Sequence, residues 1–211
     1  VTSIPAGTKK DVALVASWNE IALYVGANEN YKTIAEALAA VKEGEKIILT
    51  AGTYADDVTL NVKGITLAGK EGEKAVITGT ITIEAKDVTV QGLEFTGAAK
   101  IRGKQVIGFT FENNHIYDTE EAPNAWKEGS GYAYGFIYIS SGSSSSLSEN
   151  LSFINNTFEN VSDANANFAY VKNVTFDGNV FKNFDRDAIR FDTGGYNCGA
   201  IAFTNNEFTQ D

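Results

Sequence analysis

"NLSFINNTFEN" (residues 150–160) is one of four related segments in this chain, and this repeat decides the fold. Each copy has an apolar residue, Phe two positions later, then Asn or Gly followed by Asn, and finally an aromatic residue or Ile. The other copies are "GFTFENNHIYD" (108–118), "NVTFDGNVFKN" (173–183) and "AIAFTNNEFTQ" (200–210). A recurring unit of short strands predicts a solenoid in which each copy forms part of one β-coil.

The spacing of the copies sets the coil length. The marker phenylalanines Phe153, Phe176 and Phe203 are 23 and 27 residues apart. Two earlier segments, "DVTVQGLEFTG" (87–97) and "GITLAGKEG" (64–72), extend the repeat with Val90 and Leu67 at the marker position. Between Phe111 and Phe153 the gap is 42 residues, which predicts a coil with an inserted loop within residues 118–148. The expected fold is an all-β, right-handed, single-stranded parallel β-helix of roughly seven coils.

The repeated asparagines mark one corner of every coil. Asn tolerates a left-handed backbone, and its amide both donates and accepts hydrogen bonds. We expect the side chains at this corner to bond from coil to coil as an asparagine ladder. Its members are Asn114, Asn156, Asn179 and Asn206.

A single helix is predicted near the start of the chain, in "YKTIAEALAAVKEG" (31–44). Thr33 is the expected N-cap, and Glu36 completes a capping box. The apolar residues have helical spacing, and Gly44 follows the last of them. We expect this helix to cap the N-terminal end of a β-helix that spans residues 31–211, after lead-in strands within residues 1–30. The apolar face consists of Ile34, Ala37, Leu38 and Val41.

Charge and composition exclude several classes of partner. With 27 acidic residues against 17 basic residues, the net charge is -10, so a phosphate backbone would be repelled and nucleic acid is not expected as a partner. An anionic polysaccharide would need Ca²⁺ or a local basic patch. No apolar run reaches the length that a membrane span needs.

Residues 31–83 resemble the opening of pectin-lyase-like β-helix proteins. The shared features are aromatic-x-Thr-Ile in "YKTI" (31–34), "GTY" (52–54) and "ITLAG" (65–69), and the likeness continues through "VQGLEFTG" (90–97). Pectin methylesterases, chondroitinase B and alginate lyases begin similarly. The resemblance implies a bacterial protein, secreted or at the cell surface, that recognises or acts on polysaccharide. The segments Gln-Ala-Val-Ala and Asp-Phe-Ile-Phe-Gly of the methylesterases are absent, which excludes that activity.

The segment "NFDRDAIRFDTGG" (183–195) is the best-placed candidate for a site. Strand alternation puts Arg190 and Asp192 on the outer face of a sheet. Aligning "GFIYISSG" (135–142) with this segment places Tyr138 and Ser140 on the same face, and "NFAYVKN" (167–173) adds Ala169 to the row of Tyr138 and Arg190. By analogy with the fold, this face would hold the substrate groove.

Several roles are open to these residues. Arg190 and Asp192 would bind a sugar, with the aromatic residues stacking on its rings. Carboxylates from the same segment would hold Ca²⁺, a cation that prefers oxygen ligands. The alternative interpretation is a salt-bridged surface strand without a site. The stacking candidates are Trp126, Tyr132, Tyr134 and Tyr138, and the candidate calcium ligands are Asp185, Asp187 and Asp192.

Three functions follow from these observations. The leading one is a carbohydrate-binding module at the cell surface or outside the cell. The second is a Ca²⁺-dependent lyase of uronate polymers, in which Lys172 is the base and Arg190 assists, as the spacing of chondroitinase-like lyases implies. The third is an adhesin or structural spacer. Because the last repeat has no cap, we also expect a further domain or another chain to cover the C-terminal end.

Overall fold

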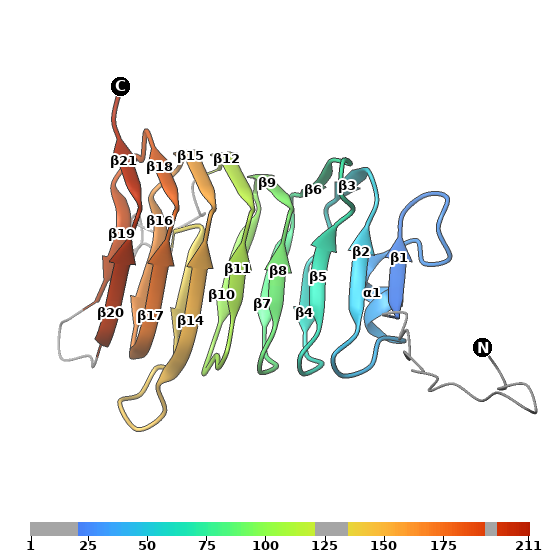
Figure 1. The fold of residues 1–211 in the computed structure, drawn as a ribbon, viewed down its shortest axis with the longest axis horizontal. Coiled ribbons are helices and arrows are strands. Elements are labelled where there is room, and N and C mark those ends of the chain that lie inside the picture. Colours follow the sequence, from blue (N-terminus) through green and yellow to red (C-terminus); the bar gives the residue numbers. More distant parts are fainter. Residues whose placement is uncertain (1–20, 121–134, 193–197) are drawn as a thin grey trace, which may run out of the picture.

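The computed structural model describes residues 21–120, 135–192 and 198–211, which form a parallel β-solenoid (Figure 1). Sheet A contains β1 (Ala22–Val25), β2 (Lys46–Leu49), β5 (Thr66–Gly69), β8 (Thr89–Gln91), β11 (Thr110–Glu112), β14 (Ser148–Ile154), β17 (Val171–Asp177) and β20 (Gly199–Thr204). Sheet B contains β3 (Gly52–Tyr54), β6 (Ala75–Ile77), β9 (Glu94–Gly97), β12 (His115–Thr119), β15 (Thr157–Val161), β18 (Val180–Lys182) and β21 (Glu207–Thr209). Sheet C contains β4 (Val58–Leu60), β7 (Thr80–Ile83), β10 (Lys100–Gly103), β13 (Ile137–Ser140), β16 (Ala164–Ala169) and β19 (Asp187–Phe191).

From β2 onward the chain visits the three sheets in the repeating order A, B, C, and neighbouring strands within each sheet pair in parallel. Each complete coil therefore contributes one strand to every sheet, and its hydrogen bonds run to the coils before and after it. The predicted all-β parallel β-helix is confirmed, and the seven strands of sheet B agree with the expected number of coils.

The repeat positions identified in the sequence lie in register in sheet A. Leu67 pairs with Val90, Val90 with Phe111, and Phe111 with Phe153. The column continues through Phe176 to Phe203. Phe153 and Phe176 stack with ring centroids 4.8 Å apart and planes 13° apart. The marker positions that align in the sequence repeats are therefore the positions that pair between successive coils.

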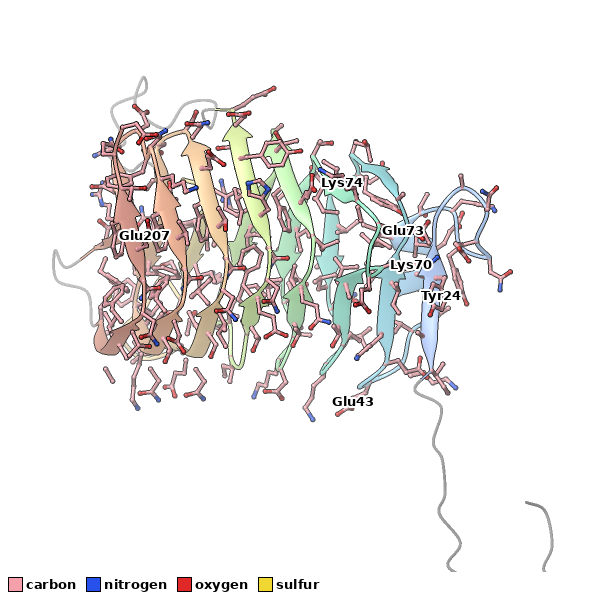
Figure 2. All side chains as sticks on the ribbon, turned by 45° about the horizontal axis from the view of Figure 1, so that its top comes forward. Tyr24, Glu43, Lys70, Glu73, Lys74 and Glu207 are labelled. Atoms are coloured by element: carbon pink, nitrogen blue, oxygen red, sulfur yellow. The ribbon has the colours of Figure 1, made fainter. Side chains whose placement is uncertain are left out.

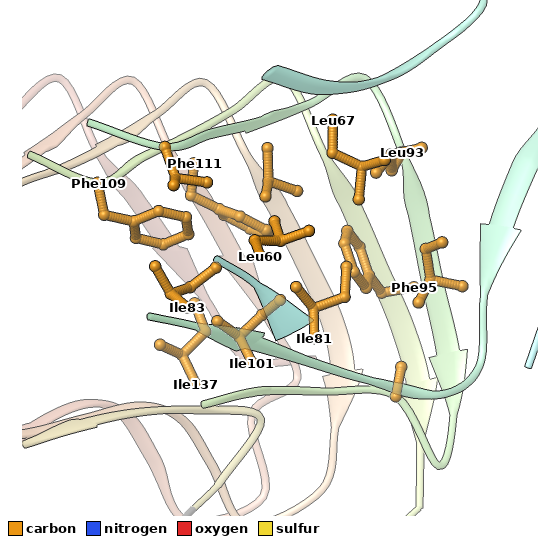
Figure 3. Close-up of a cluster of buried hydrophobic side chains, with 14 of the residues drawn as sticks. Leu60, Leu67, Ile81, Ile83, Leu93, Phe95, Ile101, Phe109, Phe111 and Ile137 are labelled. Atoms are coloured by element: carbon orange, nitrogen blue, oxygen red, sulfur yellow. The ribbon is translucent and has the colours of Figure 1, made fainter. Parts of the chain in front are cut away.

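A continuous hydrophobic core fills the space between the sheets (Figure 3). Period-2 alternation places one side of each strand inside, so Ile81, Ile101 and Ile137 form a column from sheet C. Phenylalanines from the other two sheets face this column, among them Phe111 of sheet A and Phe95 of sheet B. Both rings are fully buried. The β-branched and aromatic composition suits such pleated, closely packed surfaces.

The corner between sheets A and B carries the repeated asparagines. The Asn156 amide donates Nδ2–H to Asn179 Oδ1 at 2.9 Å, and Asn179 donates in the same way to Asn206 at 2.9 Å. The left-handed residue is the one before each of these asparagines, including Asn155 at φ 52° and Gly178 at φ 67°. Our assignment of that backbone conformation to the bonded asparagines was therefore wrong by one position. The preceding residue makes the turn, and the next side chain can then point into the corner.

The N-terminal helix is shorter than expected. Helix α1 spans Ile34–Leu38, five residues, instead of most of residues 31–44. Thr33 accepts a hydrogen bond from Glu36 N, as predicted for an N-cap, while the Glu36 carboxylate accepts from Lys32 N. The N–H groups of the two residues after Ala39 both bond to the carbonyl of Ala37, which tightens the last turn and ends the helix. Its role as a cap stays a prediction.

The long gap in the repeat contains a regular strand. Within residues 118–148, β13 pairs with β10 on one side and β16 on the other, so Ile137 lies between Ile101 and Ala166. The additional residues of this coil are thus divided between the two sides of β13. Of the expected lead-in strands, β1 lies within the described residues and pairs with β2.

Candidate functional site

The outer face of sheet C carries one row of polar side chains in register. Arg102 pairs with Tyr138, Tyr138 with Asn167, and Asn167 with Arg190. Their neighbours along each strand point into the core, so these four side chains face outward. We call Arg102, Tyr138, Asn167 and Arg190 the outer row. Because adjacent strands lie about 4.8 Å apart, the row extends for about 14 Å along the solenoid axis.

The sequence alignment predicted this row with one error. Tyr138 and Arg190 share a row, but the residue between them is Asn167, whereas Ala169 pairs with Ser140. Phe168 points inward, because its ring stacks on Phe191 in the core. Tyr170 lies between β16 and β17 with φ 56°, so the alternation of the strand ends there. The error arose because the strand before this turn starts earlier than the quoted segment suggested.

Arg190 is held by a neighbouring carboxylate. Its Nε donates to Asp192 Oδ1 at 3.0 Å, and the backbone N–H of Asp192 donates to Phe168 O at 2.8 Å. The side chains are 25% and 9% exposed, so this pair is partly buried and differs from a solvated surface pair. An Arg fixed in this way presents its remaining N–H groups in a defined direction.

The other end of the outer row is cationic. Arg102 Nη1 donates to the carbonyls of Ile101 and Phe136, both at 2.9 Å. Lys100, on the same strand, is 8% exposed and donates Nζ–H to Glu120 O at 2.9 Å. Burial lowers the pKa of Lys100, and the positive charge of Arg102 lowers it further. Sheet C therefore supplies a local basic group on a chain whose net charge is negative.

A buried carboxylate lies beside the row, at the start of β16. Asp163 Oδ1 is 3.6 Å from Arg186 Nη1, and its Oδ2 accepts from Gly135 N at 3.3 Å. Arg186 Nε is also 3.6 Å from Asp187 Oδ2. Burial raises the pKa of Asp163, while the N–H of Gly135 and the charge of Arg186 act in the opposite direction.

Two buried amides on β16 were missed in the sequence. Asn165 and Asn167 are fully buried although the alternation of β16 turns them toward the outer face. Among the described residues, neither polar side-chain atom of Asn165 has a hydrogen-bond partner. A buried polar group without a hydrogen bond costs free energy, so its presence indicates that a polar partner belongs beside it. The alternation Ala-Asn-Ala-Asn-Phe in residues 164–168 was the signal that could have identified them.

The three candidate calcium ligands have separate partners. Asp185 Oδ2 accepts from Asp163 N at 3.4 Å and lines an open groove of about 400 Å³ with Ser162 and other polar residues. Asp187 pairs with Arg186, and Asp192 with Arg190. In the described part of the chain, no group of three or more His, Cys, Asp or Glu residues is arranged to hold a metal ion.

The two candidate catalytic residues belong to different sheets. Lys172 is exposed on β17 of sheet A, in register with Glu149 and Gly199, whereas Arg190 lies on sheet C. Of the four aromatic stacking candidates, Tyr138 lies in the outer row. The other three, Trp126, Tyr132 and Tyr134, lie outside the described residues.

The structural comparison supports the fold. A pectin methylesterase crystallised with a hexasaccharide aligns with a TM-score of 0.57 at 14% identity over 93% of this chain and 67% of its own. A pectate lyase aligns with a TM-score of 0.49 at 16% identity over 77% of this chain and 54% of its own. No family model matches the sequence, and no curated protein matches it. The chain therefore shares the parallel β-helix fold of the pectin methylesterase.

No helix in the described residues has the length and apolar character that crossing a membrane would require.

Proposed function

We propose that this chain is a secreted or cell-surface polysaccharide-binding β-helix module, with the outer row of sheet C as its binding surface. The single observation that carries the proposal is the register of Arg102, Tyr138, Asn167 and Arg190. Asn167 is buried, but Arg102, Tyr138 and Arg190 are partly exposed along this line, and an extended polymer can contact these three together. The structural neighbours include proteins named for pectin and pectate, which supports a polysaccharide as the ligand.

The chemistry of the row suits a sugar chain. Guanidinium groups donate paired hydrogen bonds to carboxylates and hydroxyls, and the face of a tyrosine ring offers an apolar surface to the C–H groups of a sugar. An acidic protein needs a local basic patch to bind an acidic polymer, and Lys100, Arg102 and Arg190 supply basic side chains on sheet C.

The test is a binding measurement with matched variants. The intact chain is screened against neutral and acidic polysaccharides by affinity electrophoresis, and Arg190→Ala and Tyr138→Ala are expected to weaken binding at least about tenfold. Lys74→Ala is the control, because Lys74 is 81% exposed, immediately precedes β6 of sheet B and pairs with Glu94, away from the row. In Figure 2, Lys74 lies on the surface near Lys70 and Glu73. Equal binding by all three variants would refute the proposed surface.

The same samples separate binding from lyase activity. Absorbance of unsaturated uronate product is measured with and without Ca²⁺, for the chain and for Lys172→Ala and Arg190→Ala. Calcium-dependent product that both variants abolish would establish the lyase. Polymer binding without product is the expected result, and neither binding nor product would favour a structural spacer.

A further inference from the structure

Lys100 carries a buried amine that forms no ion pair with a carboxylate in the described part of the chain. The residue is 8% exposed, and its Nζ donates to the backbone carbonyl of Glu120 at 2.9 Å. Buried ammonium groups are found almost always with a paired charge, because an unpaired charge loses its hydration. The surroundings of Lys100 therefore favour the uncharged amine, which is a nucleophile.

A second cation lies beside this amine. Arg102 lies two residues along β10 and faces the same side of sheet C. Its Nη1 donates to the carbonyl of Phe136 at 2.9 Å, which fixes the guanidinium on this face. Burial lowers the pKa of Lys100, and the charge of Arg102 lowers it further, whereas the charges of Glu120 and Asp163 have smaller opposing effects.

The outer face between Lys100 and Asn165 carries backbone and no side chain from the described strands. The pairing of β10 with β13 and of β13 with β16 puts Lys100, Phe136 and Asn165 in one row, one position before Ile101, Ile137 and Ala166. The Phe136 side chain lies in the hydrophobic core, and the residue before it is Gly135. With two strand spacings between them, the Cα atoms of Lys100 and Asn165 lie about 10 Å apart.

Two further polar side chains border this backbone. Asp163 is 4% exposed, and its Oδ2 accepts from Gly135 N at 3.3 Å, while its Oδ1 has no hydrogen-bond partner among the described residues. Burial raises the pKa of Asp163, so this carboxyl keeps its proton to a higher pH than an exposed one. Asn165 is fully buried, and neither of its polar side-chain atoms is bonded within the described chain. A proton donor and an unpartnered amide thus lie on the same face as the Lys100 amine.

We propose that Lys100 is a nucleophilic lysine that condenses with a small hydroxyaldehyde to form an imine. Lys100 supplies the amine, Asp163 supplies the proton that removes water, and the amide of Asn165 binds the hydroxyl group of the aldehyde. An aldehyde suits the site because imine formation is reversible, whereas acyl transfer would block the amine as a stable amide. This activity does not depend on polymer binding by the outer row.

The proposed reaction consumes one aldehyde and releases one water. The lone pair of Lys100 Nζ attacks the carbonyl carbon, and one proton passes from nitrogen to oxygen, which gives a carbinolamine. Asp163 protonates the new hydroxyl group, which leaves as water while the lone pair of nitrogen forms the C=N bond. The proton that remains on nitrogen then returns to Asp163. No oxidant or reductant takes part.

The test is reductive trapping of the imine on the full chain. The probe is glycolaldehyde with sodium cyanoborohydride, which reduces the imine to a stable secondary amine, and peptide mass spectrometry measures the labelling rate of each lysine. Lys74 is the internal standard, because it is 81% exposed and its hydrogen bond to Glu94 raises the pKa of Lys74. At about pH 7, we expect Lys100 to be labelled at least about tenfold faster than Lys74, since one unit of pKa changes the uncharged fraction tenfold. Labelling of Lys100 that is no faster than that of Lys74 would overturn the proposal.

The pH dependence of the same measurement identifies the cause. The ratio of the Lys100 rate to the Lys74 rate should fall between about pH 7 and about pH 10, because Lys74 gains uncharged amine over that range. A ratio that stays constant would show that the Lys100 amine is ordinary and would contradict the proposal.

Variants test the assigned roles, with Lys74 as the standard in each protein. Asp163→Asn should lower the ratio at least about tenfold, as the loss of a general acid does. Asn165→Leu should slow labelling of Lys100 by glycolaldehyde but not by acetaldehyde, which has no hydroxyl group. An unchanged ratio in Asp163→Asn, or equal effects of Asn165→Leu on both aldehydes, would refute the arrangement of the site.

Discussion

Replacing Asn156 with Ala tests whether the buried amides at the corner hold the coils together. The Asn156 side chain donates Nδ2–H to Phe111 O at 2.8 Å and to Asn179 Oδ1 at 2.9 Å. Its Oδ1 accepts from the backbone N–H and the side-chain amide of Asn114, at 3.0 and 3.1 Å. The residue is fully buried, so water cannot replace these bonds without opening the corner.

The size of the effect follows from what Asn156→Ala leaves behind. The backbone N–H of Asn114 loses the acceptor that the structure gives it, which costs about 1–3 kcal/mol when the group stays buried. The remaining three bonds contribute about 1 kcal/mol each, and they are not fully additive because they share one amide. We expect the free energy of unfolding to fall by about 3–5 kcal/mol, measured by urea denaturation.

The control is an exposed asparagine pair of the same repeat. Asn173 donates Nδ2–H to Asn150 Oδ1 at 3.0 Å in solvent, and its φ of 56° is compatible with Gly. Asn173→Gly should cost less than about 1 kcal/mol. In addition, Asn156→Ala/Asn179→Ala should cost less than the sum of its two single changes, because they remove the same interaction. If Asn156→Ala costs no more than Asn173→Gly, the buried amides do not stabilise the solenoid as argued.

Three further predictions use the same denaturation measurement. Gly135→Ala should be much more destabilising than Gly142→Ala: both have a left-handed backbone (φ 63° and 71°), but a Cβ at Gly135 would lie 2.1 Å from a backbone carbonyl and one at Gly142 would meet no atom within 4 Å; equal losses would contradict the packing argument. Phe153→Ala should cost about 3–5 kcal/mol and Phe203→Ala less than half as much, because the first ring is fully buried and the second is 50% exposed. Burial raises the pKa of Asp163 from its ordinary value of 3.8, so its contribution to stability is fully present below that pH and is lost as the pH rises through the folded pKa; Asp163→Asn should flatten this decline, and parallel pH profiles for the two proteins would count against it.

The register of the coils could be predicted because each repeat copy carries the same marker position, at which the copies can be aligned. Phe111, Phe153 and Phe176 were aligned from the sequence alone, and the sheet pairs them in that order. The alternation of single strands also placed Arg190 and Asp192 on one side, where they form a hydrogen bond. These features depend on residues one or two positions apart, so local chemistry is sufficient to specify them.

The membership of the site was harder to predict. Sequence reasoning put Ala169 where Asn167 lies and passed over the buried Asn165. The strand before the turn at Tyr170 begins earlier than its apolar pattern shows, and no repeat copy marks its register. Lys172 and Arg190 seemed close by their spacing, yet the turn between β16 and β17 places Lys172 on another sheet.

The solenoid, its parallel strands and the inward column of phenylalanines follow from the amino-acid sequence alone, because a repeat of apolar and turn residues has one arrangement that buries every coil against the next. The side chains that share the outer face of sheet C, and the pairing of each carboxylate with its arginine, follow only from the folded coils. Those neighbours come from different coils, and their relation depends on the number of residues in each turn between the strands. A shift of one residue moves a side chain from the core to the surface, so the site follows from the geometry of the whole coil.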